Sequence, residues 1–147
     1  MTPKSVVDKI SRDVTVKKAM DFIGILHTRI PVHGDNQDAI VGLVFRRDVL
    51  QAAAEDRMEA RIEALMRPAI FVEAEKRLDT VLNQFLSQRA HMLVVADAKG
   101  VFQGVLTLED ILEELIGREI VDEKDRFVDM QELARQRAGE RKEGQLK

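Results

Sequence analysis

Apolar residues recur at helical spacing in two separate stretches of the chain. The first stretch contains Val16, Ala19, Met20 and Ile23, and the second contains Leu78, Val81, Leu82, Phe85 and Leu86. Each stretch shows the i, i+3, i+4, i+7 pattern of an amphipathic helix face. Each is followed by a β-type run, a polar turn, a second β-type run and a closing helix. After the first stretch these elements are expected at residues 30–32, 33–36, 40–45 and from 48 onward. After the second stretch they are expected at residues 92–96, 97–100, 101–106 and from 108 onward. The pattern predicts a β-α-β-β-α unit that occurs twice.

The ends of the two units match as well. A Met-x-Pro motif opens each unit, at residues 1–3 and at residues 66–68. Near the other end, Gly42 precedes Asp48 by the same interval as Gly104 precedes Asp110. Agreement at both ends indicates an internal duplication.

The duplication predicts a mixed α/β (α+β) fold. A unit of about 50 residues buries too little apolar surface to be stable alone, so we expect two pseudo-symmetric repeats packed sheet to sheet, with two equivalent clefts between them. The expected organisation is a first repeat over residues 1–57, a helical link over 58–65, a second repeat over 66–122 and a partly disordered C-terminal extension over 123–147.

Composition excludes several classes of function. The chain has no Cys, which rules out disulfides and thiolate zinc sites, and its net charge of −3 argues against nucleic-acid binding. It contains no apolar run near the roughly 20 residues of a membrane span. It also lacks a Gly-rich phosphate loop of the GxxxxGK type and a GxSxG elbow, so we expect no enzymatic activity.

The combination of motifs resembles a known family. Residues 27–32, residues 40–45, the segment from Gly104 to Gly117 and the segment from Ile120 to Glu123 are similar to the tandem CBS domains, or Bateman module, of the CorC/CNNM family, which is associated with magnesium and cobalt efflux. This resemblance implies a regulatory module that follows a transmembrane domain and lies on the cytoplasmic side of the cell membrane. The sequence would then be an excised fragment of a longer protein.

Thr107 and Asp110 have two compatible interpretations. A Thr followed three residues later by an acid is typical of a capping box at a helix start. A helix N-terminus that follows a strand closely is also a favourable phosphate site, because its N–H groups are free. In CBS proteins the matching Thr and Asp hold phosphate and ribose.

The resemblance implies one adenine-nucleotide site per chain, with ATP or AMP as the ligand. The site residues that it implies are Thr2, Val6, Val7, Thr28, Arg29, Ile30, Pro31, Thr107, Glu109 and Asp110. In the first repeat Phe45 stands where the second repeat has Thr107, so the other cleft is expected to be degenerate. Where the family often has an aromatic residue before Thr28, this chain has His27.

Acidic residues near the predicted site favour a bound cation. Glu109 and Asp110 would repel phosphates, and Mg²⁺ removes the repulsion by binding both sets of oxygens. Mg-ATP is therefore the leading ligand, and because His27, His33 and His91 show no metal-ligand spacing we expect no metal site built from histidines. The alternative function is a dimerisation scaffold whose clefts bind nothing. In either case we expect a homodimer, formed through the aliphatic face of the last helix at Leu108, Ile111, Leu112, Leu115 and Ile116.

Overall fold

The computed structural model describes residues 1–117. By its contacts the chain divides into two compact units, Met1–Leu108 and Glu109–Lys147. The first unit contains both repeats up to the end of the last strand. The described part of the second unit, residues 109–117, continues a helix that begins at residue 108. The expected extension over residues 123–147 lies outside the described residues.

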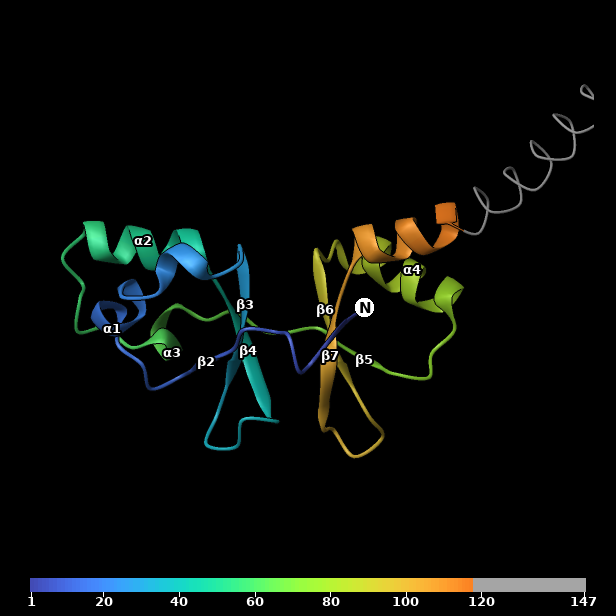
Figure 1. Ribbon diagram of the computed structural model, residues 1–147, viewed down its shortest axis with the longest axis horizontal. Coiled ribbons are helices and arrows are strands. Elements are labelled where there is room, and N and C mark those ends of the chain that lie inside the picture. Colours follow the sequence, from blue (N-terminus) through green and yellow to red (C-terminus); the bar gives the residue numbers. More distant parts are fainter. Residues whose placement is uncertain (118–147) are drawn as a thin grey trace, which may run out of the picture. The chain divides into compact units, whose positions relative to one another are not determined.

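The first repeat forms a sheet in the order β2-β3-β4 with helices on one side (Figure 1). Its elements are β2 (Ile10–Ser11), α1 (Val16–Met20), the 3-10 helix η1 (Ile23–Ile25), β3 (Arg29–His33), β4 (Ile40–Phe45) and α2 (Arg46–Ala54). β2 runs parallel to β3, and β3 runs antiparallel to β4. Val16 and Ala19, two of the apolar residues from which this helix was predicted, are the buried residues of α1.

The second repeat has the same order of elements. They are β5 (Phe71–Glu73), α4 (Leu78–Gln88), β6 (Met92–Ala96) and β7 (Phe102–Thr107), with the helix from residue 108 after them. β5 is parallel to β6, and β6 is antiparallel to β7, as in the first repeat. The predicted duplication is therefore present in the topology.

The start of the chain joins the sheet of the opposite repeat. β1 (Thr2–Pro3) pairs antiparallel with β7, which gives the sheet order β1-β7-β6-β5. The matching segment before the second repeat makes the reciprocal contact, as an isolated bridge between Leu43 and Arg67. This exchange was not expected from the sequence.

The exchange explains why both repeats carry glycine in their second long strand. A Cβ on Gly42 would lie 2.8 Å from the backbone oxygen of Arg67, and a Cβ on Gly104 would clash with the backbone oxygen of Thr2. Each strand therefore needs a residue without a side chain where the crossing segment approaches.

Buried apolar residues of the described part of the chain pack into clusters, two of which position the candidate site. The first lies within the first repeat, where Val16, Ala19, Val44 and Val49 pack with Ile62 from α3 (Ile62–Leu65). The second cluster joins the two repeats, because it contains buried residues of β4 from the first repeat and of β6 and β7 from the second. These residues are Ile40, Leu43, Met92, Val94, Phe102 and Val105. The two sheets thus share a core, as expected.

The segment between the repeats is less helical than expected. Helix occupies only Ile62–Leu65 of the link predicted at residues 58–65. α2 ends before Asp56, whose φ of 57° is left-handed. The chain then pairs with the segment before α1, through hydrogen bonds from Val16 N to Ala60 O at 2.8 Å and from Ile62 N to Val14 O at 2.9 Å. Within the link, residues 58–59 form a turn, and Arg61 forms a bridge with Thr15.

Candidate functional site

A cavity of about 270 Å³ lies between the two repeats within the first unit. Its lining comes from both repeats: Thr2, Val6, Val7, Asp8, His27, Thr28, Arg29, Pro31, Met92, Val105 and Thr107. The aliphatic, proline and methionine side chains make one part of the wall apolar, while hydroxyl and charged groups form the rest. This mixture is typical of small-molecule sites.

Strand pairing holds the lining residues in place. Thr2 on β1 is paired directly with Val105 on β7, and Met92 on β6 is paired with Thr107. Residues 28–31 enter from the start of β3. The cavity therefore depends on the strand exchange, because Thr2 reaches it only as part of the opposite sheet.

Most of the residues proposed from the sequence line this cavity. They are Thr2, Val6, Val7, Thr28, Arg29, Pro31 and Thr107. Ile30 does not, because successive side chains of a strand point to opposite faces; it is 1% exposed and belongs to the core of the first repeat. Glu109 and Asp110 belong to the second unit and are absent from the lining.

The remaining lining residues were not selected from the sequence. Asp8 and His27 form a pair at the cavity, with 4.0 Å between Oδ2 and Nε2 and with both side chains largely exposed. Met92 could have been found from the duplication, because it is the counterpart of Arg29. Met92 faces Thr107 across β6 and β7 in the same way that Arg29 faces Phe45 across β3 and β4.

Among the described residues that line the cavity, Arg29 is the only lysine or arginine. Its Nε is buried and has no hydrogen-bond acceptor in the described part of the chain. Leaving a buried donor without an acceptor costs about 1–3 kcal/mol. The guanidinium lies 5.9 Å from the centre of the Phe45 ring, its direct partner on β4. The positive charge of this side chain makes the wall of the cavity suited to an anion.

Thr107 occupies the point where β7 ends and the next helix begins. It is the last residue of β7, and residues 108–117 are helical. Thr107 is thus both a lining residue and the residue at the N-terminal end of a helix, as both interpretations of the sequence required.

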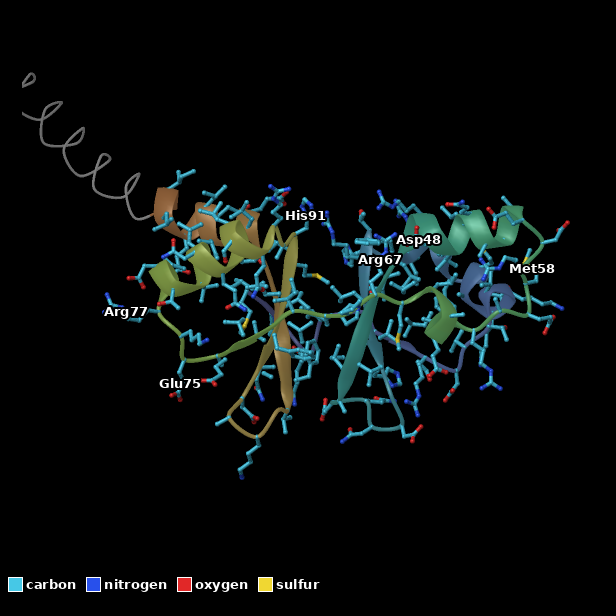
Figure 2. The ribbon with its side chains drawn as sticks, turned by 180° about the vertical axis from the view of Figure 1, so that it is seen from behind. Asp48, Met58, Arg67, Glu75, Arg77 and His91 are labelled. Carbon is cyan, nitrogen blue, oxygen red and sulfur yellow. The ribbon has the colours of Figure 1, made fainter. Side chains whose placement is uncertain are left out.

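In the first repeat the corresponding positions are occupied differently. Phe45 replaces Thr107, and Arg67 replaces Thr2 in the Met-x-Pro motif. The guanidinium of Arg67 lies 4.6 Å from the centre of the Phe45 ring and donates from Nη2 to Oδ2 of Asp48 at 2.9 Å. Figure 2 shows these Arg67 and Asp48 side chains next to each other. The matching cleft therefore holds side chains of the chain itself.

Metal ligands do not gather in the described residues. Within residues 1–117 no group of three or more His, Cys, Asp or Glu side chains is placed to hold a metal ion. No helix in this part of the chain is long and apolar enough to cross a membrane.

Known proteins share this sequence and fold. The CBS domain profile matches residues 62–117. The magnesium and cobalt efflux protein CorC of Pasteurella multocida is 36% identical over 138 residues, which cover 92% of this chain and 46% of that protein. The CBS domain of the bacterial CNNM/CorC family Mg²⁺ transporter, solved in complex with ATP, is 28% identical, with a TM-score of 0.72 over 80% of this chain and 84% of that chain. The chain is a CBS domain pair related to those of the CorC/CNNM family.

A further structure supports the fold of this CBS pair. The CBS-domain pair of Klebsiella pneumoniae with bound AMP is 24% identical and covers 79% of this chain and 94% of that chain, with a TM-score of 0.70. The fold class expected from the sequence is thereby confirmed, and the expected family is confirmed by the CBS profile, CorC and the transporter domain. The efflux protein and the transporter domain are not enzymes, in agreement with the expectation for this chain.

The CBS pair corresponds to part of its full-length relatives. It covers 46% of CorC from Pasteurella multocida and 47% of CorC from Escherichia coli K12, and it is 36% identical to each. The chain therefore spans less than half the length of these curated relatives.

Proposed function

We propose that this CBS pair binds an adenine nucleotide in the cavity between its repeats. The observation that carries the proposal is the buried Nε of Arg29, which lacks an acceptor in the described residues and lies in the wall of a half-apolar cavity. The ATP complex of the related CNNM/CorC CBS domain supports the same ligand class.

The apolar part of the cavity suits a nucleobase. Val6, Val7 and Pro31 come from the first repeat, and Met92 and Val105 come from the second. Val6 is 63% exposed, so a base placed against it would remove apolar surface from water. The cavity volume of about 270 Å³ is close to the lower end of the range for small-molecule sites and suits a base with its sugar.

The polar part of the cavity suits phosphate. Arg29 offers a charged donor, and charge-assisted hydrogen bonds to phosphate are about twice as strong as neutral ones. Thr107 offers a hydroxyl at the end of β7, where the following helix begins. Phosphates at this position would interact favourably with the helix N-terminus.

Mg²⁺ is proposed to bind together with the nucleotide. The described residues hold no carboxylate cluster for a metal, so phosphate oxygens would supply part of its coordination shell. Mg²⁺ commonly binds in this way, with one or two carboxylates and several waters. Glu109 and Asp110 were the carboxylates expected from the sequence, but they belong to the second unit and are absent from the cavity lining.

The proposed role of the bound nucleotide is regulation of an ion transporter. CorC is named as a magnesium and cobalt efflux protein, and this chain covers less than half of it. We propose that the CBS pair acts on a membrane domain of a longer protein from the cytoplasmic side, as a homodimer. Nucleotide binding would shift the equilibrium between conformations of that domain.

A dimerisation scaffold with empty clefts is the alternative, and thermal unfolding separates the two functions. A ligand that binds only the folded chain raises the melting temperature. We expect ATP with Mg²⁺ to raise the melting temperature of the 147-residue chain in a concentration-dependent way, whereas Mg²⁺ alone and tripolyphosphate with Mg²⁺ have little effect. An unchanged melting temperature at millimolar Mg-ATP would support the scaffold.

A further inference from the structure

Phe45 occupies the position in the first repeat that Thr107 occupies in the second. Met92 and Thr107 are direct partners across β6 and β7, and Arg29 and Phe45 are direct partners across β3 and β4. In the second repeat both partners line the cavity, whereas in the first repeat only Arg29 does. Phe45 thus adjoins a cavity residue without lining the cavity itself.

The ring of Phe45 lies beside three guanidinium groups. The distances from its centroid to the guanidinium carbons are 4.6 Å for Arg67, 5.0 Å for Arg47 and 5.9 Å for Arg29. An aromatic ring attracts cations within about 6 Å of its centre. Arg67 and Arg47 also form ion pairs with Asp48, at 2.9 Å and 3.8 Å. Asp48 therefore holds Arg67 and Arg47 beside the same ring that Arg29 approaches.

The backbone at this corner is also fixed. Arg46 donates from its N–H to the Thr28 oxygen at 3.0 Å, and its Nη1 donates to the Leu26 oxygen at 3.0 Å. The start of α2 therefore holds the residues that precede β3. Within this frame the rotamer of Arg29 depends on what its side chain contacts, and Phe45 is its cross-strand neighbour.

We propose that Phe45 is a positioning residue that holds the Arg29 guanidinium at the cavity in a conformation ready to receive phosphate. The proposal rests on the proposed nucleotide-binding function and adds a residue that touches no ligand. Cross-strand contacts of this type keep a long side chain ordered. A preorganised donor binds more tightly because less conformational freedom is lost on binding.

The test compares ligands that differ only in phosphate. ATP and adenosine are titrated calorimetrically, with Mg²⁺, into the wild-type chain and into Phe45→Leu and Phe45→Tyr. Phe45→Leu should weaken ATP binding about three- to tenfold, the range expected from loss of a cation–π contact, and leave adenosine binding unchanged. Phe45→Tyr keeps the ring face and should bind ATP like the wild type. Phe71→Leu, at a 46% exposed phenylalanine outside the cavity lining, is the matched control.

A double-mutant cycle with Arg29→Ala shows whether Phe45 acts through Arg29. In Arg29→Ala the further change Phe45→Leu should have no additional effect on ATP affinity, because the positioned group is gone. Equal ATP affinity of Phe45→Leu and the wild type, or an equal loss for adenosine, would overturn the role of Phe45 and leave nucleotide binding intact. Failure of the wild type to bind either ligand would overturn the proposed function as well.

An NMR measurement on the ligand-free wild type covers the case in which Phe45→Leu does not fold. If the Phe45 ring holds the Arg29 side chain, the Arg29 Nε–H resonance should have a chemical shift altered by the aromatic ring. This Nε–H group should also exchange slowly with water. An Nε–H signal with the chemical shift and exchange rate of an exposed arginine would contradict the proposal.

Discussion

Arg67 donates a hydrogen bond from Nη2 to Oδ2 of Asp48 at 2.9 Å, in the first-repeat cleft that corresponds to the proposed nucleotide cavity. Arg67 stands where the first repeat has Thr2, and Asp48 stands where the second repeat has Asp110. The duplicated sequence has thus produced two unequal clefts. Among the described residues, the Nε of Arg29 in one cleft has no acceptor, whereas in the other cleft Arg67 is paired with Asp48.

The first prediction is that Arg67→Ala leaves nucleotide binding unchanged at one site per chain. Phe45 still occupies the first-repeat cleft in this variant, and Arg67 is absent from the cavity lining. Stability should fall by no more than about 1 kcal/mol, because the Arg67 side chain is 52% exposed and exposed ion pairs are weak. Titration calorimetry checks the stoichiometry. Two comparable sites, in the wild type or in the variant, would show that the first cleft also binds nucleotide.

The second prediction separates the two roles of Thr107. Thr107→Val should lower stability by about 1 kcal/mol through loss of a helix cap and should also greatly weaken ATP binding. Thr107→Asp retains a capping side chain but places a negative charge beside phosphate, so stability should persist while ATP affinity falls. Urea unfolding and calorimetry measure the two effects. Normal ATP binding by Thr107→Asp would make Thr107 a cap alone.

The third prediction concerns the crossing of β1. Gly104→Ala should destabilise the chain by about 1–3 kcal/mol, the usual cost of overpacking, because its new Cβ meets the backbone of Thr2. ATP affinity should fall with it, since Thr2 lines the cavity. Gly24→Ala is the matched control, as nothing lies within 4 Å of a Cβ built there. Equal urea midpoints for the two variants would contradict this account.

The fourth prediction is homodimerisation through the helix that begins at residue 108. Leu112 and Ile116 on this helix are 42% and 49% exposed. Changing both to Glu should convert dimers to monomers in sedimentation velocity. Ile25→Glu, at a 76% exposed residue of η1, should leave association unchanged. A wild-type chain that remains monomeric at high micromolar concentration, with and without Mg-ATP, would exclude this dimer.

The repeat pattern was sufficient to predict the duplicated fold, whereas the candidate residues that line the cavity were named from the resemblance to the CorC/CNNM family. It could not predict the exchange of β1 and the Arg67 segment between the sheets, because short extended segments carry no apolar periodicity. Gly42 and Gly104 were recognised in the sequence as part of the repeated motif. The structure explains why these positions need glycine, because a backbone oxygen of the crossing segment approaches each of them. Ile30 was assigned to the site by the family resemblance, but the alternation of side chains along β3 turns it into the core.

Calorimetric titration of Mg-ATP into the wild-type chain, Arg29→Ala and Arg77→Ala tests the central claim most directly. The wild type should bind ATP saturably at one site per chain. Arg29→Ala should lose about tenfold or more in affinity, because a hydrogen bond to a charged group contributes about 1.5–3 kcal/mol. Arg77→Ala, which removes an 85% exposed arginine paired with Asp79, should bind like the wild type. Absence of saturable binding by the wild type, or equal affinity of Arg29→Ala and the wild type, would contradict the account.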